Sequence, residues 1–158
     1  MRRHKKEITD RAQIDAIIRE SQVCRLAMTG PEGPYIVPLN FGYDGTTLYF
    51  HCAKEGQKMD ILQANPQVCF EFDLVDELKE GKGLCSWSMS YRSVIGFGTV
   101  RFLDEPQEKQ NALQELLAQY GGPRQELQEK AVTATAVFCV DIAKITGKQN
   151  PPPDAQSH

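Results

Sequence analysis

The alternation of apolar and polar side chains along the chain is typical of short β-strands separated by turns. In Gln67–Asp73, Val68, Phe70 and Phe72 alternate with Cys69 and Glu71, which is the two-residue period of a half-buried strand. Strands are predicted at Val23–Thr29, Tyr35–Phe41, Thr47–His51, Gln67–Asp73, Leu84–Leu103 (broken near Ser90) and Ala136–Ile142. Six or seven strands with two or three peripheral helices predict a mainly β fold, an antiparallel barrel.

The central strands carry a hairpin signal and a proline. Asp44-Gly45 lies between Tyr35–Phe41 and Thr47–His51 and predicts a type I′ turn that joins these two strands. Pro38 has no N–H to donate, so its backbone is expected at a sheet edge, at a bulge, or against something other than a strand. Further along, Gly96 and Gly98 indicate a bulge, a barrel corner or a close approach by another group.

Helices are predicted where apolar residues follow a helical period between start and stop signals. The first covers residues 10–20, capped by Thr9 or Asp10, with Ile14, Ile17 and Ile18 on one face. A second begins at Gly56 and ends at Asn65-Pro66, and a third begins at a cap at Asp104 and ends at Gly121-Gly122. The apolar stripe of the third helix is expected to be ordinary core, and it consists of Leu113, Leu116, Leu117 and Tyr120.

The remaining segments are predicted to be a short helix, a loop and a tail. Gln125–Val132 is expected to be helical, and residues 74–83, which are acidic and contain lysine and glycine, are expected to form a loop. Asn150–His158, with three consecutive prolines, has little with which to pack.

Composition narrows the functional classes. The 158 residues predict one domain, and 41% hydrophobic with 25% charged residues is ordinary for a soluble globular protein. A net charge of −3 argues against nucleic-acid binding, and the basic run at residues 2–6 is expected to be a solvated tail. Five cysteines without a Cys-x-x-Cys pair, and three histidines, show no metal-ligand spacing. With no signal peptide or membrane-length apolar stretch in view, a reduced, cytoplasmic setting without a membrane is expected.

Lys58 lies in the first turn of the second predicted helix, where the helix dipole is already positive. A lysine at this position is favourable when an anion is held between it and the helix N-terminus. The alternative is a solvated lysine near Glu55 or Asp60. These residues therefore predict an anion site at Lys58 and leave that alternative open.

An ordered series of short motifs resembles the flavin-binding split-barrel proteins. Within that superfamily the chain most resembles the nitroimidazole-reductase-type branch, which is related to pyridoxamine 5′-phosphate oxidase. The resemblance runs from about Met1 to Lys148 and depends on the order of the pieces, because no single piece is diagnostic. The pieces are Met1-Arg2-Arg3, Val37-Pro38-Leu39-Asn40-Phe41-Gly42-Tyr43, Phe50-His51-Cys52-Ala53 with Gly56, Lys58 and Leu62, Tyr91-Arg92-Ser93-Val94-Ile95-Gly96, and Ile145-Thr146-Gly147-Lys148.

The resemblance implies a split β-barrel over residues 1–148, followed by a disordered tail at 149–158, and a homodimer with FMN at the subunit interface. Residues 37–41 would flank the flavin ring, Lys58 and Arg92 would neutralise its phosphate, and His51 would be the catalytic residue that donates a hydrogen bond or proton near the substrate. The cofactor-binding set implied in this way is Val37, Pro38, Leu39, Asn40, Phe50, His51, Gln57, Lys58, Tyr91, Arg92 and Ser93.

Each of these residues has a structural alternative. Pro38 can be an edge-strand proline, His51 a half-buried histidine with a backbone partner, and Arg92 one half of a surface ion pair. Tyr91 can be core and Ser93 an ordinary strand residue. Trp87 can lie over a ring, at the dimer interface, or in simple packing.

The chain departs from the pyridoxamine-phosphate oxidases at two places. It has Gln57-Lys58 where those enzymes carry an Arg-Lys pair, and it lacks their C-terminal Trp and Arg signature. The first departure removes one charge from the phosphate site, for which Arg92-Ser93 can compensate, since arginine binds phosphate through two hydrogen bonds. The second departure argues against pyridoxamine phosphate as the substrate. The expected function is an FMN-dependent oxidoreductase of the nitroreductase type, acting on a small molecule. The alternatives are a flavin carrier or sensor without catalysis, a haem or deazaflavin protein on the same barrel, and a structural dimer with an empty cleft.

Overall fold

The computed structural model describes residues 6–83, 86–123, 125 and 127–150. Its helices are α1 (Arg11–Glu20), α2 (Gln57–Ala64), α3 (Pro106–Gln119) and α4 (Glu129–Ala134). Its strands are β1 (Glu7–Ile8), β2 (Cys24–Gly30), β3 (Gly33–Leu39), β4 (Gly42–Tyr43), β5 (Thr47–Cys52), β6 (Gln67–Lys79), β7 (Ser88–Leu103) and β8 (Ala136–Asn150).

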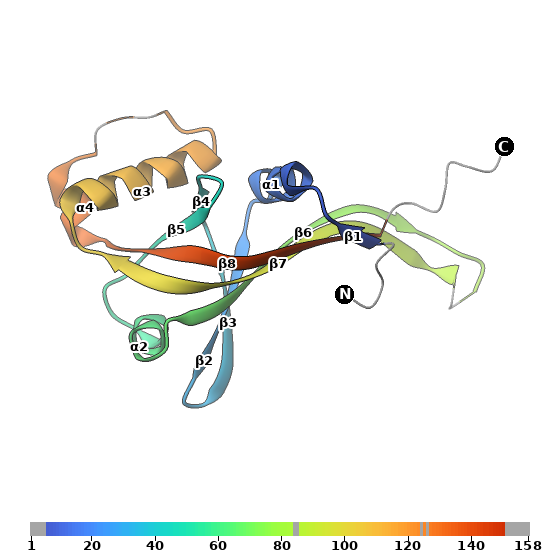
Figure 1. Cartoon of the computed structure of the whole chain (residues 1–158), viewed down its shortest axis with the longest axis horizontal. Coiled ribbons are helices and arrows are strands. Elements are labelled where there is room, and N and C mark those ends of the chain that lie inside the picture. Colours follow the sequence, from blue (N-terminus) through green and yellow to red (C-terminus); the bar gives the residue numbers. More distant parts are fainter. Residues whose placement is uncertain (1–5, 84–85, 124, 126, 151–158) are drawn as a thin grey trace.

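The eight strands of the described residues form a single antiparallel sheet in the order β3-β2-β6-β7-β8-β5-β4, with β1 added to β8. The helices lie at its periphery, α3 and α4 at one end and α1 beside the middle of the sheet (Figure 1). The predicted mainly β architecture with peripheral helices is confirmed. The sheet curls around a core but does not close, because no pairing joins β3 to β4 or β5 among the described residues.

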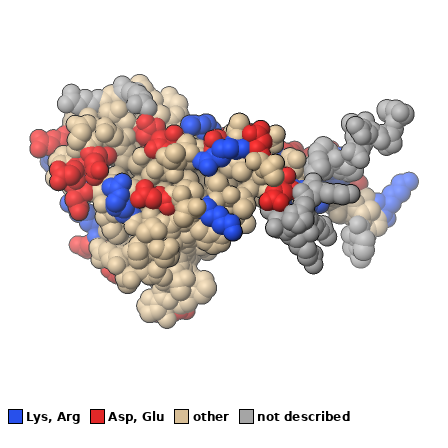
Figure 2. All heavy atoms as spheres, viewed as in Figure 1, with Lys and Arg blue, Asp and Glu red and all other residues tan. Residues whose placement is uncertain are grey.

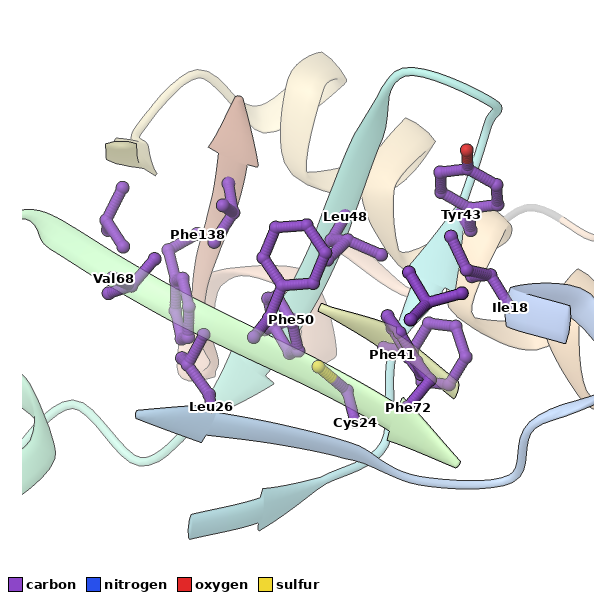
Figure 3. Close-up of a cluster of buried hydrophobic side chains, with 14 of the residues drawn as sticks. Ile18, Cys24, Leu26, Phe41, Tyr43, Leu48, Phe50, Val68, Phe72 and Phe138 are labelled. Atoms are coloured by element: carbon purple, nitrogen blue, oxygen red, sulfur yellow. The ribbon is translucent and has the colours of Figure 1, made fainter. Parts of the chain in front are cut away.

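Aromatic and aliphatic side chains from most of the strands fill the inside of the curled sheet. Phe50 of β5 stacks on Phe138 of β8 with ring centroids 5.1 Å apart, and Phe41 contacts Phe72 at 4.8 Å. Figure 3 shows these rings pointing toward one another between the strands. Ile14, Ile17 and Ile18 are the buried face of α1, as the periodicity of residues 10–20 predicts, and Asp10 caps that helix by accepting from the N–H of Ala12.

The predicted pairing of the central strands is wrong. β3 pairs with β2 along its whole length, and the Asp44-Gly45 turn instead joins β5 to β4, a strand of two residues. A type I′ turn is also excluded, because Gly45 has a positive φ (107°) whereas no residue other than glycine does. The carboxylate of Asp44 holds the turn by accepting from the N–H groups of Thr46 and Thr47, both at 2.8 Å.

The segment expected to be a loop at residues 74–83 is strand as far as Lys79. β6 and β7 form a long hairpin that projects from the body of the molecule (Figure 1). Residues 75–78 are all exposed, and the register shifts between Val75 and Glu77. The sequence therefore shows no alternation of apolar and polar residues here that would indicate a strand. β7 is continuous through Ser90, and its register shift against β8 lies at Phe97/Gly98 instead. Gly96 confirms the expected close approach, because a Cβ there would come within 2.1 Å of the Phe70 ring.

Smaller differences concern the ends of elements. Glu105 and not Asp104 occupies the N-cap of α3, without a side-chain hydrogen bond, and α4 begins at Glu129 instead of Gln125. β8 continues eight residues past the predicted Ile142 to Asn150, so it includes the first two residues of the expected tail. The rest of that tail, residues 151–158, lies outside the described part of the chain.

Candidate functional site

Two strand edges without partners leave a gap in the curled sheet. β3 pairs only with β2, and in β5 the residues Phe50–Cys52 pair only with β8, whereas Leu48 and Tyr49 also pair with β4. The chain runs from β3 through Asn40 and β4 into β5, so the two edges diverge from one place. Backbone N–H and C=O groups along both edges are therefore available to a ligand placed between them.

Side chains alternate along β3, so only some of residues 37–41 point outward. Val37 and Leu39 are half-buried against the core, whereas Pro38 and Asn40 are exposed. Pro38 lies in an edge strand, which is the location that its missing N–H allows. Phe41 and Phe50 are fully buried, so from these two positions only the backbone is open to a ligand.

The N-terminus of α2 lies at the open end of this gap. Gly56 precedes the helix with φ 118°, a conformation that favours glycine, and no side chain caps the helix. Gln57 is exposed and borders the β2–β3 turn together with Tyr35, so the helix start spans from the end of β5 to the start of β3. Met59 and Asp60 donate their N–H groups to the Gly56 carbonyl, so the N–H groups of Gln57 and Lys58 are the ones that an anion at this helix start could use.

Lys58 is half-buried beside the end of β5. Burial raises the pKa of the Cys52 thiol, and the positive charge of Lys58 opposes part of that rise. The Cys52 thiol itself lies 3.5 Å from the Met59 sulfur. Gln57 therefore lies beside the start of β3, and Lys58 follows the end of β5; the cofactor-binding roles assigned to them from the sequence stay predictions.

The segment Tyr91–Ser93 lies far from Lys58 in the same chain. Met59 shares a pocket with Phe102, and Phe102 and Arg92 are ten residues apart along β7, or about 30 Å at roughly 3.3 Å per residue. Arg92 binds two carboxylates, Glu20 at 3.0 Å and Asp76 at 2.8 Å. The hydrogen bonds to Asp76 are the largest cause of the raised pKa of Arg92. One chain therefore cannot place Lys58 and Arg92 on one phosphate, and a shared site requires a second subunit.

The other two residues of that segment have neighbours within the sheet. The ammonium of Lys148 lies over the Tyr91 ring, 5.6 Å from its centroid. Ser93 pairs with Asp73 on one side and Lys148 on the other.

His51 and Asn40 meet at the wall of a pocket of about 430 Å³ between the sheet and the α3–α4 end of the molecule. His51 is exposed, so the alternative of a half-buried histidine is wrong. The opposite wall of the pocket is formed by three leucines of α3, Leu113, Leu116 and Leu117, and by Tyr120, the residue that follows the helix. The expectation that this stripe is ordinary core is therefore wrong, because only Leu116 among the four is buried.

The helix that carries this wall is held tightly against the sheet. The Tyr120 hydroxyl accepts from the N–H of Phe41 at 3.1 Å and donates to the carbonyl of Gln22 at 3.0 Å. Gly42 permits the close contact, because a Cβ there would lie 2.6 Å from the backbone of Glu115 and Leu116. The sequence carries no signal for this pocket, since a leucine stripe looks the same whether it meets a core or a cavity.

Other kinds of site find no support in the described residues. No group of three or more His, Cys, Asp or Glu side chains gathers in a metal-binding arrangement there. The described cysteines, Cys24, Cys52, Cys69 and Cys139, are all free thiols. None of the described helices is both long enough and apolar enough to cross a membrane. Charges of both signs are mixed over the face shown in Figure 2, with acidic side chains gathered near the α3–α4 end.

Comparison with known proteins places this geometry in a family. Residues 10–149 match the family described as pyridoxamine 5′-phosphate oxidase. A solved structure of a candidate 5-nitroimidazole antibiotic resistance protein from Bacteroides thetaiotaomicron is 36% identical, with a TM-score of 0.82 over 90% of this chain and 86% of that one. A FAD and haem binding protein from Mycobacterium smegmatis superposes with a TM-score of 0.83 at 21% identity, covering 95% of this chain and 77% of that one.

An uncharacterized protein from Rhizobium meliloti is 25% identical over 89% of this chain and 93% of its own length. The likeness at 36% identity and the family match both extend over nearly the whole described sheet, so the predicted split barrel is confirmed as the fold class. The chain belongs to the pyridoxamine 5′-phosphate oxidase family of split-barrel proteins.

Proposed function

We propose that the protein binds FMN between the β3 and β5 edges and acts as an oxidoreductase on a small molecule. The observation that carries the proposal is the uncapped N-terminus of α2, with Lys58 in its first turn, at the open end of the gap between two unpaired strand edges. One helix N-terminus and one lysine suit a single terminal phosphate. The family match and the flavin-binding names among the similar structures support a flavin as the ligand.

The chain's own residues would bind and orient the cofactor. Gln57 and Lys58 would hold the phosphate, the backbone of residues 37–40 would lie along the ring on the β3 side, and Phe50 and His51 would bound it on the β5 side. The flavin would supply the electron transfer. His51 and Asn40, which also border the 430 Å³ pocket, would donate hydrogen bonds where a substrate meets the ring.

The proposal includes a homodimer. On the outer face of the sheet, Ile36, Ala27, Cys69 and Phe97 form a row across β3, β2, β6 and β7. Ile36 is 60% and Phe97 51% exposed, and Ile95 on the same face is 43% exposed. An apolar row in the middle of a sheet, where one face has no cover, is typical of an interface. A second subunit on this face would also allow its Tyr91–Ser93 segment to approach the first subunit's cofactor.

The decisive test compares two ligands and two lysines. Replacing Lys58 by Ala should weaken FMN roughly ten- to hundredfold and riboflavin little, because only FMN carries the phosphate charge. Lys54→Ala is the matched control, because Lys54 is an exposed lysine four residues earlier and outside α2. Dissociation constants would be measured by quenching of flavin fluorescence.

Two results would count against the proposal. Equal losses of FMN and riboflavin in the Lys58 variant would remove Lys58 from the phosphate site. A wild-type protein that binds neither ligand would show that the gap is not a flavin site.

A further inference from the structure

The pocket beside the proposed flavin site is apolar on its α3 side and polar on its sheet side. The α3 wall contributes the apolar side chains of Leu113, Leu116 and Leu117, while polar groups come from Asn40 and His51 on the sheet side. A volume of about 430 Å³ is within the range of roughly 300–1,000 Å³ that small-molecule sites occupy. An apolar wall facing a few polar groups is the arrangement that orients a flat, mainly apolar ligand by one polar end.

The lining of the pocket carries no carboxylate, ammonium or guanidinium among the described residues. Apart from the imidazole of His51, the described lining offers no group that could carry a charge, so an ionised ligand would lose its hydration with little compensation, and that desolvation is unfavourable. The acidic side chains near the α3–α4 end would repel an anion further. The two remaining polar contributors are already engaged: Thr135 donates to the Ala131 carbonyl at 3.1 Å, and Tyr120 is bonded to Phe41 and Gln22.

We propose that this pocket is the substrate site and that it selects uncharged, mainly apolar ring compounds over anionic ones, with Asn40 and His51 as the polar anchors. The proposal rests on the proposed flavin function, because the pocket shares Asn40 and His51 with that site. It excludes phosphorylated and carboxylated compounds as good substrates. The α3 leucines, and not the strand residues, determine this selectivity.

A matched ligand pair tests the selectivity directly. 2-Naphthol and naphthalene-2-sulfonate share a ring system and differ in charge at neutral pH. Binding to the purified protein would be measured by calorimetry, both with FMN bound and without it. The wild-type protein should prefer 2-naphthol by about tenfold or more, because no described lining residue other than His51 could offer the sulfonate an opposite charge.

Charge placed on the helical wall should reverse the preference. Leu117→Lys should weaken 2-naphthol and strengthen the sulfonate, which moves the ratio of the two dissociation constants by about tenfold or more. Ala118→Lys is the matched control, since it adds the same charge one residue further along α3, at an exposed position outside this pocket. If Leu117→Lys does not fold, Ala131→Lys introduces the charge at an exposed position of the pocket's α4 side.

The outcomes separate this inference from the flavin proposal. If FMN binds but the wild-type protein shows no preference between the two naphthalenes, or the Leu117 and Ala131 variants leave the preference unchanged, the inference is wrong and the flavin site stands. If FMN does not bind but the preference and its reversal are seen, the pocket selectivity stands and the flavin proposal is wrong. Reversal by Ala118→Lys as well would also overturn the inference, because a long-range charge effect would then explain the result.

Discussion

His51 is exposed in β5 and lines the wall between the pocket and the proposed flavin gap. This position allows its catalytic role to be tested separately from its role in stability. His51→Gln should leave FMN bound and unfolding stability within about 0.5 kcal/mol of the wild type, because an exposed side chain contributes little to packing. The rate at which pre-reduced flavin is oxidised by a quinone should fall roughly 100-fold, the effect typical of losing a general acid.

The readout for this variant is single-turnover oxidation, normalised to bound flavin. An unchanged rate in the flavin-loaded variant would remove His51 from catalysis and would favour a flavin carrier over an enzyme. Loss of flavin from the variant would instead make His51 a cofactor ligand.

Asp44 links the stability of the β4–β5 turn to pH. Burial tends to raise its pKa, but hydrogen bonds from the Tyr49 hydroxyl and from Thr46 and Thr47 outweigh burial and lower the pKa below 3.8. Because the folded-state pKa is the lower one, this stabilisation is present above the unfolded pKa of about 3.9 and is lost as pH falls through the folded value. Asp44→Ala should therefore lower the free energy of unfolding by roughly 1–3 kcal/mol at pH 7.

Denaturant titrations of the Asp44 variant and the wild type between pH 7 and pH 3 would test this dependence. The difference between the two proteins should shrink at the acid end, where the wild-type carboxylate becomes protonated. Asp104→Ala, at an exposed position before α3, should show a small difference at every pH. A difference for Asp44 that stays constant with pH would contradict the charged role.

At the scale of elements, the packing of α3 on β4 determines the shape of the pocket. Gly42→Ala would place a methyl group 2.6 Å from the α3 backbone, and backbone cannot move aside as a flexible side chain can. Overpacking of this kind should cost about 1–3 kcal/mol of unfolding free energy. It should also weaken 2-naphthol binding, because α3 must shift away from the sheet.

Urea unfolding of the flavin-free protein measures the first effect, and Gly83→Ala supplies the comparison. Gly83 has a negative φ, and the nearest atom to an added Cβ, the Ser86 hydroxyl oxygen, is 4.0 Å away, so this variant should stay within about 0.5 kcal/mol of the wild type. Similar stabilities for the two variants would show that α3 has room to move at Gly42.

At the scale of the whole molecule, the outer sheet face of the described chain exposes the apolar side chains of Ile36, Ile95 and Phe97. If the outer row packs on a second copy, Phe97→Arg should convert dimer to monomer in sedimentation, because an unpaired charge would then lie at the interface centre. Flavin affinity should fall with it, since ligand binding and subunit association are linked by mass action.

Ala118→Arg controls for the added charge, because this residue is exposed and belongs to helix α3, outside the outer row of the sheet. A wild-type monomer that retains FMN after dilution would contradict the interface model. It would also mean that Arg92 forms surface ion pairs with Glu20 and Asp76 and does not bind the phosphate.

Local patterns in the sequence were enough to determine the existence and type of most elements. The apolar face of α1, the strand alternation of β6 and the Gly56 start of α2 each follow from neighbours within a few residues, where side-chain period and backbone freedom act directly. The order of motifs likewise led to the split-barrel class and to Lys58, because Gln57-Lys58 and the end of β5 are adjacent in the chain.

Only the tertiary structure decided which strand pairs with which and what the apolar stripes face. The Asp44-Gly45 signal specifies a turn but not the strands that flank it; β3 pairs with β2 through the tight Gly30–Gly33 hairpin, and it is β4, a strand of two residues, that pairs with β5. The separation of Lys58 from Arg92 depends on where α2 packs against β7, because Met59 lies near Phe102, ten residues from Arg92 along that strand. The α3 stripe became a pocket wall because Gly42 and Tyr120 fix the helix against one end of the sheet and leave space beside Asn40 and His51.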